Sequence, residues 1–302
     1  MQQIKNIIKF LVLLPISISR IFENVYEKIL RVIFNSQFSS TIRNNYIKSN
    51  NLRHQTVTHK SKNGDIFNAT FFTPNAICQF RADTFSTKEP EMLEWIDDYG
   101  DNGVFFDIGA NIGLYSIYFA KMKKGMTYAF EPSVFNVGQI AKNISINKLN
   151  DKICLIPNPI SRENSISSFI ISGTEEGGAL NAFGVNYGYD GKPIQNMVEF
   201  GLLGFSLDKM IELSLIRDIP TMIKIDVDGI EHLILEGAKK TLSRDECKTI
   251  FIEVNDDFDA SSNKINQILK DYGFVLKNKL HSDMVEQSTK FSSIYNQIWV
   301  KK

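Results

Sequence analysis

The sequence predicts a doubly wound α/β fold, in which helices cover both faces of a mostly parallel sheet, preceded by a helical and hairpin extension. First, short apolar strands alternate with helical patterns from position 104 onward, an order typical of α/β sheets. Second, these strands are continuously apolar, as strands buried on both faces are. Third, the 302 residues are 43% hydrophobic and 23% charged, which excludes a disordered, collagenous or polytopic membrane protein.

Charge is unevenly distributed along the chain. Residues 1–62 contain ten Lys or Arg and two Glu, a net charge of +8, so the other 240 residues carry −8 and the whole chain carries zero. A total of zero gives no general attraction to nucleic acid. We therefore predict a basic N-terminal arm, residues 1–62, with a partner of its own, and a main domain, residues 63–302.

The arm contains two patterns that bear on a membrane. The apolar run Phe10–Leu14 is far shorter than a spanning helix, although the two lysines before it and the tripeptide Ser17–Ser19 also fit a signal peptide. Apolar residues then recur at spacings of three and four over 22–33, with basic residues between them. Residues 1–35 can thus make peripheral contact with an anionic membrane, or this amphipathic helix can pack on the main domain.

Cysteine usage indicates the compartment. Cys78, Cys154 and Cys247 lie 76 and 93 residues apart, which fits neither a zinc motif nor a disulfide framework. The reducing cytosol is therefore the predicted location, with membrane association if residues 1–35 bind lipid.

Turn, cap and periodicity signals assign the elements in order. Residues 55–72 alternate about a turn at Asn63-Gly64 and predict a β-hairpin. A helix over 84–98 follows, with Ser86 or Thr87 as its cap and Pro90 in its first turn. The later patterns predict strands over 104–108, 127–130, 153–156, 222–227, 249–254, 274–276 and 294–300, and helices over 114–122, 134–147, 207–213, 230–242 and 263–272.

The strand over 104–108 runs into a glycine-containing turn, DIGANIG, over 107–113. Its glycines permit a tight turn and close approach of a cofactor beyond the carboxyl end of the strand. Glu131 ends the next strand 24 residues after Asp107, where a carboxylate can accept hydrogen bonds from both ribose hydroxyls of an adenosine. A nicotinamide fingerprint would need a third glycine, whereas Asp107 suits the cationic groups of S-adenosylmethionine. We predict S-adenosylmethionine as the cofactor.

Four ordered blocks of the main domain resemble the FkbM family of S-adenosylmethionine-dependent methyltransferases. They are DIGANIGLYSIYFAK, YAFEPSVFNVGQIAKNISINKLNDKI, SLDKMI and IKIDVDGIEHLILEGA, and the similarity extends over about 84–252. The resemblance implies a class I, Rossmann-like methyltransferase fold and usually methyl transfer to an oxygen of a sugar, polyketide or similar acceptor. After the third strand, Pro159 stands where members often carry a small residue. The expected cofactor-binding residues are Asp107, Gly109, Ala110, Asn111, Gly113, Glu131 and Asn158.

The fourth strand carries charges that a central strand normally lacks. Period-two alternation over 223–228 places Lys224, Asp226 and Asp228 on one side of it, and such charges are costly unless they are paired or used. Glu231 and His232 follow at the start of the next helix, near where a bound methyl group would point. We predict that these five residues form the catalytic cluster.

Methyl transfer to an alcohol requires activation of the hydroxyl group. His232 or one of the carboxylates can act as general base, or Asp226, Asp228 and Glu253 can hold Mg²⁺. In a purely structural alternative, Lys224 and Asp226 form an internal ion pair and Glu231 caps its helix.

The glycine-rich segment 173–204 combines glycines with aromatic residues. It can form a lid that stacks on a sugar ring, or a long surface hairpin. We predict O-methylation of a hydroxyl on a carbohydrate or glycolipid acceptor. The competing class is a non-catalytic module that keeps the cofactor fold and is recruited to a membrane or protein partner.

Overall fold

The computed structural model describes residues 52–194, 197–281 and 291–302, so residues 1–35, predicted to contact a membrane, lie outside the described part. The chain divides into compact units at Arg53 and His54, so the first strand, His54–Lys60, belongs to the same unit as the sheet domain. Within the described ranges, no helix is long and apolar enough to cross a membrane. The predicted functional division at 62–63 stays a prediction.

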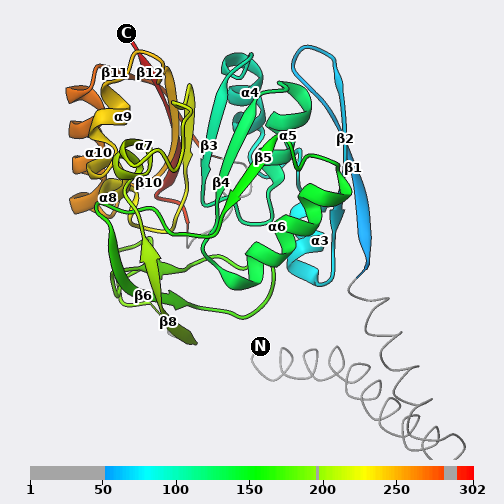
Figure 1. Ribbon diagram of the computed structural model, residues 1–302, viewed down its shortest axis with the longest axis horizontal. Coiled ribbons are helices and arrows are strands. Elements are labelled where there is room, and N and C mark those ends of the chain that lie inside the picture. The colour runs from blue at the N-terminus through cyan, green and yellow to red at the C-terminus, as the bar shows by residue number, and fades with distance from the viewer. Residues whose placement is uncertain (1–51, 195–196, 282–290) are drawn as a thin grey trace, which may run out of the picture. The chain divides into compact units, whose positions relative to one another are not determined.

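A seven-stranded sheet forms the centre of this unit, with the order β11-β12-β10-β9-β3-β4-β5 (Figure 1). The five strands from β10 to β5 run parallel, whereas β12 and β11 are antiparallel additions at one edge. This confirms the predicted doubly wound fold. The strands are β3 (Val104–Ile108), β4 (Met126–Phe130), β5 (Ile153–Ile156), β9 (Met222–Ile225), β10 (Thr249–Asn255), β11 (Phe274–Leu280) and β12 (Ile294–Lys301).

Helices cover both faces of the sheet, and alternation along β3 separates the two cores. Phe105 packs in the core that also contains Trp95 and Phe119, whereas its neighbour Phe106 packs in the core that contains Trp299. One face carries α4 (Pro90–Tyr99), α5 (Leu114–Met122) and α6 (Val134–Ile146), and the other carries α7 (Leu207–Glu212), α8 (Glu231–Glu236), α9 (Lys239–Ser243) and α10 (Asp259–Asp271) (Figure 1).

Two smaller sheets extend the domain. The predicted hairpin, β1 (His54–Lys60) and β2 (Ile66–Phe72), packs beside α6, where Asn143 and Asn147 accept hydrogen bonds from backbone amides of β2. After β5, the chain forms an antiparallel sheet of β6 (Ser165–Ile171), β7 (Ala182–Phe183) and β8 (Val198–Gly204), of which β7 and β8 come from the predicted lid segment 173–204.

Three local differences from the sequence prediction have physical causes. The helix predicted over 230–242 breaks at Gly237, the C-cap of α8, where the backbone passes so close to Ser161 that a β-carbon would lie 2.3 Å from its carbonyl oxygen. The sequence prediction missed α3 (Ala76–Asp83), whose N-cap Asn75 accepts a hydrogen bond from a first-turn amide. Strand β9 ends at Ile225, so the period-two argument for residues 226–228 was wrong: these residues form a turn.

Candidate functional site

A cavity of about 420 Å³ lies at the carboxyl ends of β3, β4, β9 and β10, the edge at which ligands bind in sheets of this class. Its volume falls in the range of about 300–1,000 Å³ typical of small-molecule sites. Helix α3 and the segment 178–181 contribute walls, as do Phe291 and Ile294 near β12. The predicted site residues that line it are Gly109, Asn111, Glu131, Asn158, Asp226, Asp228 and Glu253.

Close packing of neighbouring segments requires glycine at two positions of the turn after β3. Gly109 has φ +81°, and a β-carbon on it would lie 1.9 Å from the carbonyl oxygen of Asp226. Gly113 has φ +85°, and its β-carbon would lie 2.7 Å from Ile140. Both positions therefore need glycine to bring β9 and α6 close to the turn, and Gly109 also exposes its backbone to the cavity. Ala110 and Gly113 do not line the main cavity.

Glu131 lies at the end of β4, as predicted, with its carboxylate held by two backbone amides. Asn111 N donates to Oε2 over 2.7 Å, and Ser133 N donates to Oε1 over 2.8 Å. Burial raises the pKa of Glu131 to about 7, partly offset by these hydrogen bonds. Each carboxylate oxygen keeps a second lone pair, so the residue can still accept hydrogen bonds from a ligand.

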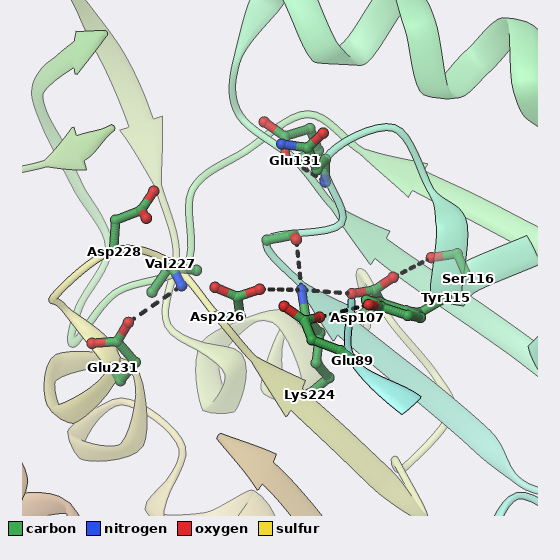
Figure 2. A network of polar contacts seen from close by, with 12 residues as sticks. Glu89, Asp107, Tyr115, Ser116, Glu131, Lys224, Asp226, Val227, Asp228 and Glu231 are labelled. Atoms are coloured by element: carbon green, nitrogen blue, oxygen red, sulfur yellow. Dashed lines mark hydrogen bonds and ion pairs between the residues drawn. The ribbon is translucent and has the colours of Figure 1, made fainter. Parts of the chain in front are cut away.

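Lys224 is the centre of a buried ionic network beneath the turn (Figure 2). Its Nζ donates to the carbonyl oxygen of Gly109 over 2.7 Å and lies 3.4 Å from Asp107 Oδ1 and 3.3 Å from Asp226 Oδ2. Burial alone would lower the pKa of Lys224, but Asp226 and Asp107 raise it above its usual value. The structure therefore contains the internal Lys224–Asp226 ion pair that the structural alternative predicted.

Asp107 belongs to this network and does not line the cavity. Its side chain is fully buried, and Ser116 of α5 donates a hydrogen bond to Oδ2 over 2.6 Å. The carboxylate thus holds β3, α5 and β9 together through Ser116 and Lys224. Its predicted role, contact with the cationic groups of the cofactor, stays a prediction that this burial does not favour.

Glu231 supports the turn between β9 and α8. Its Oε1 accepts hydrogen bonds from Gly229 N over 3.0 Å and Val227 N over 3.3 Å. The side chain is buried and does not line the cavity, and burial raises its pKa to about 7. Glu231 therefore organises the turn that carries Asp228.

Asp228 faces the cavity from that turn, with φ +64°. Its Oδ2 accepts hydrogen bonds from Leu180 N over 2.7 Å and Asn181 N over 3.2 Å, which join the turn to segment 178–181. Burial and the nearby Asp226 raise its pKa to about 6. Oδ1 makes no hydrogen bond to the described residues, so one oxygen is available to a ligand.

His232 lies away from the cavity, although it follows Glu231 directly. Its Nδ1 lies 2.9 Å from Ser261 Oγ of α10, and its ring packs edge-on against Phe258. Burial lowers the pKa of this histidine. The geometry therefore does not place it against a substrate bound in the cavity.

The predicted metal ligands, Asp226, Asp228 and Glu253, all line the cavity but do not form a coordination site. Across residues 52–194, 197–281 and 291–302, no group of three or more His, Cys, Asp or Glu side chains is arranged to hold a metal ion. The arrangement of these side chains does not support the Mg²⁺ hypothesis.

The segment 176–178 is fixed to the domain by side chains from three elements. From α3, Arg81 Nε donates to the carbonyl oxygen of Gly177 over 2.7 Å. Asn111 and Asn136 each donate to the carbonyl oxygen of Gly178, over 2.8 and 3.1 Å. Gly178, which lines the cavity, is therefore held in place, and β7 and β8 are the parts of the predicted lid that lie in the antiparallel sheet.

Comparison with known families agrees with this geometry. The family model described as the Methyltransferase FkbM domain matches residues 107–276, more than half of the chain. The chain belongs to the FkbM methyltransferase family. This family consists of S-adenosylmethionine-dependent methyltransferases, and the chain has the predicted class I fold. Among curated proteins, none matches the chain.

Several solved methyltransferase structures match the chain at low identity and with TM-scores below 0.5. The FkbM methyltransferase of Methylobacillus flagellatus has 18% identity and a TM-score of 0.43, with 66% of this chain and 44% of that chain covered. A magnesium protoporphyrin IX methyltransferase of Synechocystis with bound S-adenosylmethionine has 14% identity and a TM-score of 0.42, with 76% and 85% covered. The present chain thus spans less than half of the Methylobacillus protein.

The cavity fits the cofactor of the FkbM family. A carboxylate, Glu131, faces it from the end of β4, and the bare backbone of Gly109 forms part of its wall. Sequence reasoning missed Arg81, which lines the cavity from α3, and Glu89, which lines it from the loop before α4. Their positions depend on how the N-terminal helices pack across the sheet edge, and the sequence signal for α3 was only its Asn75 cap.

Proposed function

We propose that this FkbM-family protein transfers a methyl group to a hydroxyl oxygen of a carbohydrate or glycolipid acceptor. The observation that supports this is the position of Asp228: a carboxylate in the cavity wall with one oxygen held by backbone amides and the other available. When bound, S-adenosylmethionine supplies an electrophilic methyl group to this cavity. Aromatic residues Tyr189 and Phe291 line the same cavity and offer faces on which a sugar ring can pack.

Asp228 is the proposed general base. A hydroxyl group is a poor nucleophile near neutral pH until its proton is removed. Because burial raises the pKa of Asp228 to about 6, the carboxylate is ionised at neutral pH yet more basic than an exposed aspartate. Oδ1 accepts the proton, while the Oδ2 hydrogen bonds to Leu180 and Asn181 hold the carboxylate in place.

The test is methyl transfer by purified protein to defined glycans and glycolipids. We expect formation of S-adenosylhomocysteine that depends on the acceptor, and a new O-methyl group located by mass spectrometry and NMR. Absence of turnover with every acceptor, despite cofactor binding, would favour the non-catalytic alternative. Methylation at nitrogen or carbon would replace the proposal with another transfer reaction.

The basic arm supports a second proposal, that residues 1–35 bring the enzyme to anionic membranes and hence to a glycolipid acceptor. The support is the excess of basic residues and the amphipathic spacing over 22–33. Each basic residue near an anionic surface contributes about 1 kcal/mol, so binding should weaken as salt rises. Equal sedimentation of full-length and arm-deleted protein with anionic liposomes would contradict it.

A further inference from the structure

The charges around the cavity are balanced at one end and unbalanced at the other. At the first end, Lys88 pairs with Glu89 over 2.5 Å, and Lys224 lies 3.3 Å from Asp226. At the second end, Asp228 and Glu253 face the cavity, and neither forms an ion pair with a described residue. We call this second end the acceptor end; it comprises Asp228, Glu253, Asn181, Tyr189, Phe291 and Ile294.

Several contacts show that the acceptor end is one continuous surface. The backbone amide of Asn181 donates to Asp228, and Asn255, two residues after Glu253 on β10, donates to the carbonyl oxygen of Tyr189 over 3.0 Å. The rings of Tyr189 and Phe291 lie 5.4 Å apart. Asn255 also pairs with Ile294 across β10 and β12. The two carboxylates therefore lie within one pocket with an aromatic side.

The two carboxylates lack a compensating cation. Burial and the surrounding carboxylates Asp226, Asp228, Glu89 and Glu231 raise the pKa of Glu253 well above its usual value. Arg81 acts on Asp228 from α3 without forming an ion pair with it. A positive charge placed beside Glu253 would thus favour its ionised form, which no described side chain does through an ion pair.

Hydrogen-bond capacity points in the same direction. Asp228 Oδ1 has no described donor, and no hydrogen bond from a described residue reaches the Glu253 carboxylate. Asn181 Oδ1 is also buried without a partner among the described residues. The Asp228 and Asn181 oxygens are acceptors, and the Glu253 carboxyl group becomes an acceptor when it loses its proton, so the complementary ligand is a cationic donor. A protonated amine has three donors and no acceptor.

We propose that the acceptor of this methyltransferase is a hydroxylated molecule that carries a protonated amine, such as an amino sugar, with the amine bound by Glu253 beside Asp228. The proposal rests on the proposed function, because it assumes that the hydroxyl to be methylated occupies this end of the cavity. Glu253 binds and orients the acceptor, Asp228 takes the hydroxyl proton, and the Tyr189 and Phe291 rings pack on the apolar face of the sugar.

The test compares three probes that differ at one substituent: the methyl glycosides of glucosamine, N-acetylglucosamine and glucose. Calorimetry is done with full-length protein saturated with S-adenosylhomocysteine, which lacks the sulfonium charge but keeps the α-ammonium group of the cofactor, so that the preference for the amine is measured with the cofactor site occupied. We expect the amine to bind about tenfold or more tightly than either neutral probe, the effect of a charge-assisted hydrogen bond. Equal binding of the three probes, or no binding of the amine, would overturn the proposal.

A pair of variants tests whether Glu253 causes the preference for the amine. Glu253→Gln should remove the preference for the amine while leaving S-adenosylhomocysteine affinity unchanged, whereas Glu246→Gln, an exposed glutamate before β10, should retain it. An amine preference that survives in folded Glu253→Gln would overturn the assignment. If that variant does not fold, the test is made on the wild-type protein. Ionisation of Glu253 on amine binding should release protons, which calorimetry detects as binding heats that differ between buffers. Absence of proton release would overturn the proposal.

The two proposals fail in different ways. If glycans are O-methylated but glucose derivatives serve as well as glucosamine derivatives, the amine inference fails and the proposed function stands. If glucosamine binds preferentially and the methyl group is found on its nitrogen, the O-methyl function fails. If amine binding is preferred and Glu253-dependent, with transfer to a hydroxyl oxygen, both are supported.

Discussion

The Lys224 network and the acceptor end lie on the same edge of the sheet, but the buried charges are paired in the network and unpaired at the acceptor end. In the network, Asp107 and Asp226 share a buried lysine that also donates to the Gly109 carbonyl (Figure 2). At the acceptor end, Asp228 lies apart from the ion pairs of Lys224 (Figure 2), and Glu253 has no described cation. Paired buried charges hold strands together, whereas unpaired charges at a cavity wall are available to bind a ligand.

The largest expected effect lies at the acceptor end. Asp228→Asn keeps an oxygen to accept the Leu180 and Asn181 amides but removes the proton acceptor, so turnover should fall about 10²–10⁴-fold. Cofactor affinity should change little, as measured by calorimetry. Asp245→Asn, at an exposed position, is the matched control and should retain full turnover. Wild-type turnover in Asp228→Asn would mean that the two ends do not differ in catalytic role.

The opposite outcome is expected for the paired end. Lys224→Met leaves the Asp107 and Asp226 carboxylates without their cation, and breaking such a buried pair costs about 3–5 kcal/mol of stability. Denaturant unfolding measures this loss. The double variant Lys224→Met with Asp107→Asn should recover part of it, because one unpaired charge is removed. If Lys224→Met unfolds at the wild-type denaturant concentration, the network is not structural.

The pH dependence of stability tests whether buried Glu231 is protonated in the folded protein. The folded protein keeps a proton on Glu231 up to about pH 7, whereas the unfolded chain releases it near the usual value of 4.5. Unfolding therefore releases a proton between these pH values, and wild type loses stability relative to Glu231→Gln as pH rises through them, by up to about 3 kcal/mol. Denaturant curves of both proteins at pH 5 and pH 8 measure the difference. A difference that is independent of pH would show that Glu231 is ionised throughout.

The sequence predicted the framework of the site better than its chemistry. Strand β3, its DIGANIG turn and Glu131 at the end of β4 are local patterns, since continuous apolar runs and glycines specify them without knowledge of distant contacts. Which charges pair, by contrast, depends on packing across strands. Asp107 was predicted to contact cofactor, but Ser116 and Lys224 surround it, 9 and 117 positions away along the chain.

Glu131 provides a test of the cofactor half of the cavity. Glu131→Ala removes the carboxylate proposed to bind the ribose hydroxyls, so cofactor affinity should fall by about 1.5–3 kcal/mol, as expected for hydrogen bonds to a charged group. The Asn111 and Ser133 amides also lose their acceptor, so part of the effect can come from the turn itself. Glu131→Gln, which retains an oxygen acceptor for the turn, separates the two contributions. Unchanged S-adenosylhomocysteine binding in both variants would remove Glu131 from the cofactor site.

Substitution of His232 should have the smallest effect, because this residue is close to the cavity residues in sequence but not in space. The residue follows Glu231 directly, but its ring contacts Ser261 of α10 and Phe258 just before that helix rather than the cavity. His232→Ala should therefore cost about 1 kcal/mol of stability through the lost hydrogen bond and leave turnover unchanged. The rate of wild type should fall below about pH 6, where Asp228 becomes protonated, and the variant should show the same fall. If the fall disappears in folded His232→Ala, histidine is the base, and the carboxylate at the acceptor end serves only to bind.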